Sequence, residues 1–364
     1  LKAGAEMEAQ DKNGATALMY AAGVYQNLED QLKASAEKAL DATMGEFLLP
    51  LMDDVDIKAT SPSPSQSWNA NPEVIIALLK AGANANARDK NGWTPLICAA
   101  RNQSSGVITG LLKAGADVNA LSKECGTLGI EHGMTPLMEA AGFNKNPMVI
   151  ATLLNAGADL KAQNEDGQNA LMCAAQYNKN PEVITALLKA GADLKAQSES
   201  GFTPLMAAAM FNENPDVITA LLKAGADLKA RSKYGQTALM DAAQYNPNPK
   251  MIDVLLKAGA DIKSQDTSGN TSLMCAAQAN EHPEVIIALL KAGADLKARN
   301  KDGQSALMCA AQYNGNPEVI TTLLKAGADP KAKDKAGRTA LSYAQLNKKL
   351  KDTEAYHKLE EASK

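Results

Sequence analysis

Cysteine and histidine are the scarce residue types in this chain whose side chains commonly bind metal ions or take part in catalysis. The sequence holds five cysteines and three histidines. Four of the cysteines share one position, directly before a pair of alanines in a repeated phrase: Cys98, Cys173, Cys275 and Cys309. If successive phrases stack at helix-packing distance, about 10 Å, neighbouring thiols are too far apart for a disulfide or for one shared metal ion. We expect this column of thiols to be small apolar filler of the core.

The remaining candidates for chemistry are scattered along the chain. Cys125 and His132 lie seven residues apart, with no further ligand, orienting base or oxyanion donor nearby in the sequence. His282 and His357 stand apart from them, and the sequence contains no P-loop, HExxH or GxGxxG motif. The alternating Asp and Lys of the connecting segments are typical of a solvated face. These patterns predict a protein with no catalytic site, no metal, no cofactor and no small-molecule substrate.

Composition narrows the classes of partner. The 364 residues carry a net charge of −4, which argues against nucleic acid or an anionic membrane surface, because both need a basic excess. No apolar run approaches the roughly 18 residues that span a membrane. Five cysteines without a CxxC pair indicate no disulfide framework and favour a reducing compartment such as the cytoplasm. A signal peptide upstream of the first residue is left open.

The elements that position these residues come from internal repetition. The glycine of an "AGAD" phrase recurs every 34 residues, at Gly157, Gly191, Gly225, Gly259, Gly293 and Gly327. A segment that begins at Ala170 returns almost unchanged 136 residues later, which is four periods. Such a chain is expected to fold as a stack of similar units, each in contact with its neighbours.

One unit can be followed from its residues. The turn glycine Gly167 precedes a first helix with Leu171, Ala174 and Ala175 on one face. The second helix carries the usual signals of a helix start, a buried stripe and a helix end: N-cap Asn180, then Pro181 and Glu182, buried Val183, Ile184, Leu187 and Leu188, and a left-handed cap at Gly191. Two helices of about ten residues cannot bury this stripe alone, so each unit must stack on its neighbours.

The phrases "GWTPLICAA" from Gly92, "GMTPLMEAA" from Gly133 and "GFTPLMAAA" from Gly201, with "LLKAGADVNA" from Leu111, closely resemble the ankyrin repeat. The resemblance covers nearly the whole chain outside residues 24–68. It implies an all-α solenoid of stacked helix-turn-helix units joined by hairpin-like loops. In that architecture the first helices line a concave groove, the second helices face the convex side, and the hairpin tips project.

The chain departs from the family pattern in three ways. The His usual after "TPL" is Ile at Ile97 and Met at seven positions: Met19, Met138, Met172, Met206, Met240, Met274 and Met308. We expect apolar packing there in place of a hydrogen bond that the family makes. The period is 34 rather than about 33, because "YNxNP" adds one residue between the helices. "DVNA" has mostly become "DLKA". None of these changes threatens the expected fold.

Turn glycines predict nine units in a single domain, residues 1–364, and place two interruptions. Residues 24–68 break the first unit and are predicted to form an amphipathic helix followed by a Ser/Pro linker. This insertion either covers the apolar end of the stack or docks a partner. Residues 121–132 lengthen one hairpin into a finger. The last unit, residues 334–364, has a strongly charged second helix, as a C-terminal capping repeat requires.

By the same resemblance, partners are met by the hairpin tips and by the two residues that follow the Ala-Ala pair on the groove face. Most rings of this aromatic-poor chain stand there, and aromatic side chains are typical anchors of interfaces. A ring at one fixed repeat position could instead stack on its neighbours as an internal ladder, and both interpretations stay open. The candidate binding residues are Phe143, Gln176, Tyr177, Met210, Phe211, Gln244, Tyr245, Gln312 and Tyr313 in the groove, and Trp93, Phe202 and Tyr234 at the tips.

Two functions are consistent with these observations. The first is a non-catalytic scaffold that binds a protein partner through the groove and the hairpin tips. The second is a structural subunit that stacks with copies of itself into a fibre or oligomer, which the near-identical units favour. The chain begins with "LKAGA", which matches the end of a second helix. We therefore expect its natural sequence to continue upstream of Leu1.

Overall fold

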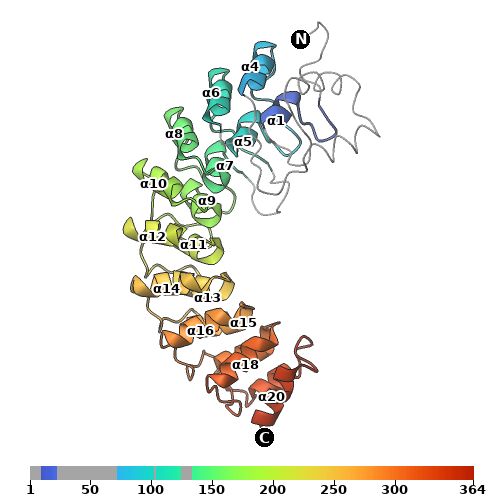
Figure 1. Ribbon diagram of the computed structural model, residues 1–364, viewed down its shortest axis with the longest axis vertical. Coiled ribbons are helices and arrows are strands. Elements are labelled where there is room, and N and C mark those ends of the chain that lie inside the picture. Colours follow the sequence, from blue (N-terminus) through green and yellow to red (C-terminus); the bar gives the residue numbers. More distant parts are fainter. Residues whose placement is uncertain (1–9, 23–71, 102–103, 124–132) are drawn as a thin grey trace. The chain divides into compact units, whose positions relative to one another are not determined.

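The computed structural model describes residues 10–22, 72–101, 104–123 and 133–364 (Figure 1). Within these ranges the regular elements are α-helices, with two isolated β-bridges, Gln10–Thr16 and Gln265–Thr271. The chain is thus an all-α solenoid of helix pairs. The predicted insertion 24–68, the segment Leu1–Ala5 and most of the predicted finger 121–132 lie outside the described residues.

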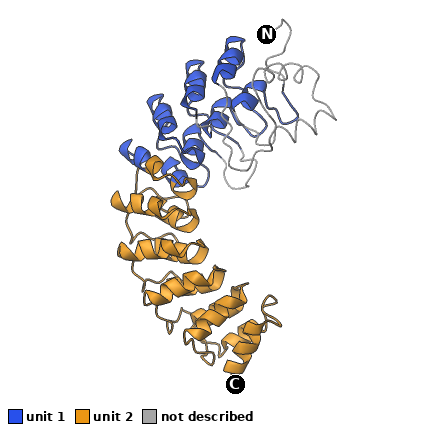
Figure 2. Cartoon of the chain, in the orientation of Figure 1, with its two compact units in different colours: residues 1–174, 185–192 blue, residues 175–184, 193–364 orange. Residues whose placement is uncertain are grey.

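The chain divides into two compact units, which Figure 2 distinguishes by colour. Unit 1 falls within residues 1–174 and 185–192, and unit 2 within residues 175–184 and 193–364. Helices α9 (Ala170–Tyr177) and α10 (Pro181–Lys189) are divided between the units. Each unit is described by itself, and the single domain over 1–364 stays a prediction.

Unit 1 consists of two rows of helices. The first helices α1, α5 and α7 pack in one row, and the second helices α4, α6 and α8 pack in another, as Figure 1 shows. The bounds are α1 (Ala17–Ala22), α4 (Pro72–Lys80), α5 (Pro95–Ala100), α6 (Ser105–Lys113), α7 (Pro136–Phe143) and α8 (Pro147–Asn155).

Unit 2 has the same two rows. The first helices α11, α13, α15, α17 and α19 pack in sequence order, and so do the second helices α12, α14, α16, α18 and α20. The bounds are α11 (Pro204–Phe211), α12 (Pro215–Lys223), α13 (Ala238–Tyr245), α14 (Pro249–Lys257), α15 (Ser272–Ala279), α16 (Pro283–Lys291), α17 (Ala306–Tyr313), α18 (Pro317–Lys325), α19 (Ala340–Ala344) and α20 (Glu354–Ala362).

Local signals explain why the helices begin and end where they do. Thr203 is the N-cap of α11 and accepts a hydrogen bond from the N–H of Met206 at 3.3 Å. The predicted N-cap Asn180 accepts from the N–H of Glu182 at 3.0 Å, and the predicted cap Gly191 has φ of 94°. Leu188 differs from its prediction, since it is half-buried. Its position lies one residue beyond Leu187, at the edge of the buried stripe.

The methionine and cysteine columns form the core of the first-helix row. Met138, Met172, Met206 and their equivalents are at most 1% exposed, which confirms apolar packing at the position where the family usually has His. Cys98, Cys173, Cys275 and Cys309 are free and buried. Both columns are therefore packed between neighbouring helices, as their small or flexible side chains allow.

Backbone hydrogen bonds join the hairpin tips of neighbouring repeats. In unit 2 the N–H of Lys233 donates to the carbonyl of Ser200 at 3.0 Å, and the same bond recurs in the following hairpins. Gly201, with φ of 79°, stands directly at this junction, where a Cβ atom would lie 2.9 Å from the Lys233 nitrogen. Only glycine fits this left-handed position beside the next hairpin.

A column of buried asparagines joins the repeats between the two helix rows. The side-chain amide of Asn280 donates to the carbonyls of Ala243 and Asn246 in the preceding repeat, both at 2.9 Å. Its Oδ1 accepts from the N–H of His282 at 2.9 Å. The same arrangement recurs at Asn212, Asn246 and Asn314. These bonds satisfy backbone carbonyls at the ends of the first helices.

Candidate protein-binding surface

An exposed apolar residue stands at or just beyond the end of most first helices of unit 2, directly before the inter-helix asparagine. Phe211 is 49% exposed, Tyr245 46%, Tyr313 55% and Leu346 81%. These four residues are named the unit 2 stripe. Ala279 holds the same position at the end of α15 and interrupts the row.

The buried asparagine explains why its neighbour in the sequence is exposed. Asn246 ends α13 by donating its N–H to the carbonyl of Ala242 at 3.0 Å, and its side-chain amide bonds to the preceding repeat. The preceding residue, Tyr245, is rotated by about 100° around the helix axis and therefore faces solvent in part. The stripe thus follows from the way each first helix ends.

Ala279 limits an internal ladder of rings. Tyr245 and Tyr313 are two repeats apart, which is roughly 20 Å at helix-packing distance. Aromatic rings interact at centroid distances of about 4.5–7 Å, so these two rings cannot stack on each other. A ladder of rings therefore cannot be continuous through α15, and Tyr245 and Tyr313 are 46% and 55% exposed.

The glutamines beside the stripe are held by internal hydrogen bonds. Each bonds through its side-chain amide group to a residue of its own repeat, so its polar atoms are already partly satisfied. Gln176 is in addition only 6% exposed. The bonds are Gln176 Nε2 to Tyr177 Oη at 2.7 Å, Gln236 Nε2 to Gln244 Oε1 at 2.9 Å, and Gln304 Nε2 to Gln312 Oε1 at 2.8 Å.

The three predicted tip residues are placed differently from one another. Tyr234 precedes its turn glycine and is 60% exposed. Phe202 follows its glycine and is half-buried, and Trp93, at the same position, is only 8% exposed. The residue after the glycine turns back toward the first helix, so Trp93 does not project from the hairpin as a tip residue would.

Two predicted residues of unit 1, Trp93 and Phe143, belong to a cluster around Arg101. Nε of Arg101 donates to Oε2 of Glu139 at 2.7 Å. The guanidinium carbon lies 4.2 Å from the centroid of the Phe143 ring and 5.4 Å from that of Trp93. These are distances of cation–π contact. The sequence analysis did not single out Arg101 or Glu139; the charge of Glu139 in a column otherwise rich in cysteine was the signal.

Burial of the Glu139 carboxyl is partly compensated by Arg101. The side chain of Glu139 is 1% exposed and that of Arg101 is 30% exposed. Burial raises the pKa of Glu139, and the charge and hydrogen bond of Arg101 lower it by less, so the pKa stays above its usual value. A guanidinium at the surface thus reaches a carboxyl that is out of contact with solvent.

The cysteine column itself carries unreactive thiols. Burial raises the pKa of Cys309 to about 12, and it also raises the pKa of Cys98 and Cys275. A thiol with such a pKa is protonated at neutral pH and is a poor nucleophile or metal ligand. Cysteine at this position therefore behaves as apolar filler, as expected.

Unit 2 replaces one member of the cysteine column by Asp241. This side chain is 0% exposed, and within the part of the chain that the structure describes neither carboxyl oxygen has a hydrogen-bond partner. Burial raises the pKa of Asp241 to about 8. A buried carboxyl without donors is costly to ionise, so Asp241 is mostly protonated at neutral pH. The sequence analysis did not identify it either.

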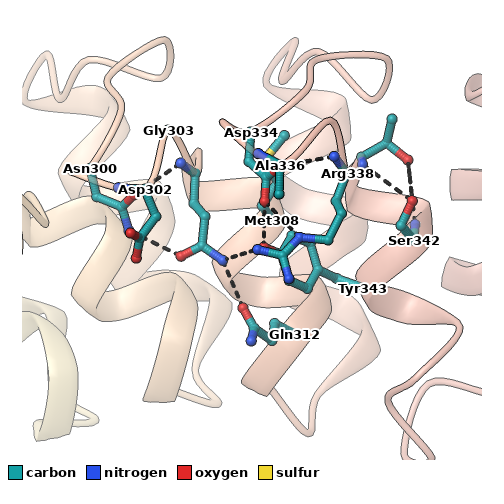
Figure 3. A network of polar contacts seen from close by, with 12 residues as sticks. Asn300, Asp302, Gly303, Met308, Gln312, Asp334, Ala336, Arg338, Ser342 and Tyr343 are labelled. Atoms are coloured by element: carbon teal, nitrogen blue, oxygen red, sulfur yellow. Dashed lines mark hydrogen bonds and ion pairs between the residues drawn. The ribbon is translucent and has the colours of Figure 1, made fainter.

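The last member of the column, Tyr343, is held by a polar network that Figure 3 shows. Its hydroxyl donates to Oδ2 of Asp334 at 2.7 Å and accepts from Nε2 of Gln304 at 2.8 Å. Nε of Arg338 donates to the same carboxylate at 2.9 Å. Burial acts to raise the pKa of Asp334, but these bonds and two backbone N–H donors outweigh it and lower the pKa to about 2. The network fixes the final repeat against its neighbour.

The described residues also bear on metal sites and membrane spans. Over the described ranges, no three His, Cys, Asp or Glu side chains gather as one metal would require. None of the described helices combines the length and the apolar character needed to cross a bilayer. Cys125 and His132 lie outside the described residues.

Comparison with known proteins identifies the repeat. The family model described as "Ankyrin repeats (3 copies)" matches residues 65–122, 120–198, 177–266, 239–334 and 273–354. A search of the curated proteins finds no match. Ankyrin repeats are in general protein–protein interaction modules. Because the matches run without a break from residue 65 to residue 354 and the helix pairs repeat as that family's do, the chain belongs to the ankyrin-repeat family.

Proposed function

We propose that this chain is a non-catalytic scaffold that binds a protein partner through the unit 2 stripe. The observation that carries the proposal is the exposure of three rings at one position of the first-helix row: Phe211, Tyr245 and Tyr313. Burial of an aromatic side chain removes roughly 150–250 Å² of its surface from water. A partner that covers the exposed part of these rings would therefore gain free energy from the hydrophobic effect. Aromatic residues of this kind dominate the energetics of interfaces.

The regular spacing of the stripe indicates the shape of the partner. Apolar side chains that recur at one repeat position, about 10 Å apart or about 20 Å across Ala279, suit an extended or repeating segment better than an irregular globular surface. Tyr234, 60% exposed at a hairpin tip, adds a further apolar contact beside the first-helix row of unit 2.

The experiment that tests this function compares two sets of variants. We expect the triple variant Phe211→Ala, Tyr245→Ala, Tyr313→Ala, immobilised and exposed to an extract of the source cells, to retain the partner at least about tenfold less than the wild type. The matched control is Ile287→Ala in α16, which removes an apolar side chain that is 40% exposed on the second-helix row. Quantitative mass spectrometry of the retained proteins measures both.

Two outcomes would contradict the proposal. One is equal retention by the wild type and the triple variant. The other is a large fall in the melting temperature of the triple variant, because exposed substitutions change stability by only about 0.5 kcal/mol each. That fall would mark the rings as structural.

A separate measurement tests the alternative function, in which the chain assembles with copies of itself. The chain has a mass of 38.2 kDa, and a monomer should give this value in light scattering at micromolar concentration. A larger mass that returns to this value in the triple variant would identify a second copy of the chain as the partner of the stripe.

A further inference from the structure

Four positions can be compared between the two units, because each lies at the same number of residues after the turn glycine of its repeat. In unit 1 these positions hold Trp93 and Arg101 from one repeat, and Glu139 and Phe143 from the next. Nine residues separate Gly92 from Arg101, and six separate Gly133 from Glu139. This group is named the Arg101 cage, because the guanidinium lies over two rings and bonds to a buried carboxylate.

The same count in unit 2 selects Phe202, Met210, Asp241 and Tyr245. Both rings and the buried carboxyl of the Arg101 cage are thus present again, and methionine stands in the place of the cation. Helices α11 and α13, which carry Met210 and Asp241, pack against each other. Asp241 and Tyr245 are four residues apart on α13 and therefore lie on the same face of that helix. Burial, and after it the charge of Asp241, raises the pKa of Tyr245. This group is named the Asp241 cage.

Polar groups of the same unit do not reach the carboxyl of Asp241, whose two oxygens have no hydrogen-bond partner among the described residues. The hydroxyl of Ser232 accepts from the N–H groups of Tyr234 and Gln236, and the amide of Gln236 donates to Gln244 at 2.9 Å. From the preceding repeat, α11 contributes Ala207 and Met210 at the facing positions, and neither has a donor. Both carboxyl oxygens therefore stay open to a cation from outside the chain, and the hydroxyl of Ser272 on the neighbouring helix α15 (Ser272–Ala279) is likewise buried without a partner in the described residues.

We propose that the Asp241 cage binds an arginine side chain of the protein partner, in the way that the Arg101 cage holds its own arginine. This inference rests on the proposed function and names the chemistry that the partner presents beside the unit 2 stripe. Tyr245 belongs to both the stripe and the cage, so an arginine next to an apolar segment of the partner reaches the carboxyl while the segment covers the rings.

The Arg101 cage shows that such a carboxyl can be reached. Glu139 is 1% exposed, and the arginine that binds it keeps 30% of its side chain in solvent. In the Asp241 cage the half-buried Met210 has three rotatable side-chain bonds and can turn aside at little cost. Arginine fits better than lysine, because a planar guanidinium lies flat on rings and is weakly hydrated.

Binding of a guanidinium is coupled to proton release. Burial raises the pKa of Asp241 to about 8, so a cation that binds the carboxylate form displaces a proton at neutral pH. The titratable groups that face the carboxyl are Tyr245 on its own helix and Cys275 on α15, and α11 contributes none at Ala207 or Met210. Affinity for the guanidinium therefore rises with pH up to about 8.

The first test places the cation in the chain itself. Met210→Arg recreates the Arg101 cage in unit 2, so we expect it to raise the melting temperature of the protein. In the Asp241→Asn background the same substitution should raise it by less than half as much, because the neutral amide offers no charge to the guanidinium. If the effect of Met210→Arg is the same in both backgrounds, the cage geometry is wrong and the proposal is overturned.

The second test uses a peptide probe on the full chain. The probe is a short capped peptide, Gly-Ala-Arg-Ala-Gly, and its control carries citrulline, a neutral isostere, in place of arginine. Isotope-labelled methionine methyl groups report binding by NMR, at Met210 in the wild type and in Asp241→Asn, and at Met206 and Met240 in all variants. We expect the arginine peptide to bind about tenfold or more tightly than the citrulline peptide, and Asp241→Asn and Met210→Arg each to abolish that difference. Equal affinities of the two peptides, or no binding of the arginine peptide up to about 10 mM, overturn the proposal.

Failure of the cage and failure of the scaffold give different results. If natural partner retention depends on Phe211 and Tyr313 but is unchanged in Met210→Arg, the stripe binds a partner that inserts no arginine. If retention is lost in neither set of variants, the scaffold function itself falls. A loss in both sets supports the stripe and the cage together.

Discussion

Both units bury a carboxyl group between first helices, and the two units differ in what accompanies it. In unit 1 Nε of Arg101 lies 2.7 Å from Glu139, and two rings flank the guanidinium. In unit 2 the carboxyl of Asp241 is equally buried, without a hydrogen-bond partner in the described residues, and Met210 takes the place of the arginine. The carboxyl is compensated by a cation in one unit and by protonation in the other.

This difference shows how a carboxyl group can be accommodated at the position of Glu139 and Asp241, because the helices that carry the two residues begin in the same way. Thr135 and Thr237 cap the two helices in the same way, each accepting from the N–H three residues later. The two helices therefore begin with the same capping bond, and the side chains around the two carboxyl groups can be compared directly. One chain thus contains a buried carboxyl with a cation and a buried carboxyl without one. Substitutions that exchange these two arrangements measure what the cation contributes to stability.

The largest effect is expected when unit 1 is given the arrangement of unit 2. Arg101→Met leaves Glu139 buried without its cation and removes both cation–π contacts, so we expect a loss of about 3 kcal/mol in the free energy of unfolding. Hydrogen exchange of the α5–α8 peptides localises the loss to unit 1. The matched variant is Arg101→Met with Glu139→Cys, the residue of the sister repeats, which should recover most of the stability. A loss that persists in the double variant would assign it to packing.

The second effect concerns pH and appears in unit 2. The folded pKa of Asp241, about 8, lies above the ordinary value of 3.8, so the folded state holds a proton that the unfolded state has lost. Stability contributed by this proton is full at low pH and declines as pH rises toward 8. We expect unfolding free energy to fall by about 2 kcal/mol between pH 6 and pH 8, measured by urea denaturation.

The control for that prediction is Asp241→Cys. This variant restores the residue of Cys275 and Cys309, whose thiols are protonated over the same range, so its stability should be nearly flat between pH 6 and pH 8. The pH dependence of stability that Asp334 contributes has the opposite sign. Its pKa is lowered to about 2, so its contribution to stability is lost only when pH falls below about 4. A decline with pH that survives in Asp241→Cys would assign the titration to another group.

A feature that both units share should give equal effects in each. The amide of Asn144 donates to the carbonyl of Ala100 at 2.8 Å in unit 1, and that of Asn280 donates to Ala243 and Asn246 in unit 2. Alanine at either position leaves buried carbonyls without a donor, at a cost of about 1–2 kcal/mol. Denaturation of Asn144→Ala and Asn280→Ala should show similar losses. Losses that differ several-fold would show that the asparagine column does not act alike in both units.

Most of the fold could be predicted from the sequence, because local signals mark where the helices begin and end. Side-chain contacts between repeats could not be predicted in this way. The N-cap Asn180 and the left-handed Gly191 depend on the nearest residues, so the sequence indicates both. The Arg101–Glu139 pair depends on side-chain directions in two repeats 38 residues apart, which no local pattern specifies. The YNxNP phrase predicts only one added residue between the helices, although the recurrence of its first asparagine in most units, as at Asn144, Asn212 and Asn280, indicates a shared contact.

The smallest expected effect exchanges a loop contact that distinguishes the units. In unit 1 the amide of Asn119 donates to the carbonyl of Gly157 at 3.2 Å, and its Oδ1 accepts from the N–H of Asp159 at 2.8 Å. Unit 2 has lysine at this position, for example Lys229, and an ammonium cannot accept that N–H. We expect Asn119→Lys to destabilise unit 1 by about 0.5–1 kcal/mol.

The reciprocal variant Lys229→Asn should stabilise unit 2 by a similar amount, as hydrogen exchange of the α12–α14 peptides can measure. The two exposed bonds are weak because water competes for the same groups, which is why lysine is tolerated there. If Lys229→Asn has no effect while Asn119→Lys does, the loops of unit 2 do not present the carbonyl and N–H as those of unit 1 do. The difference between the units would then extend from side chains to the backbone of the connecting loops.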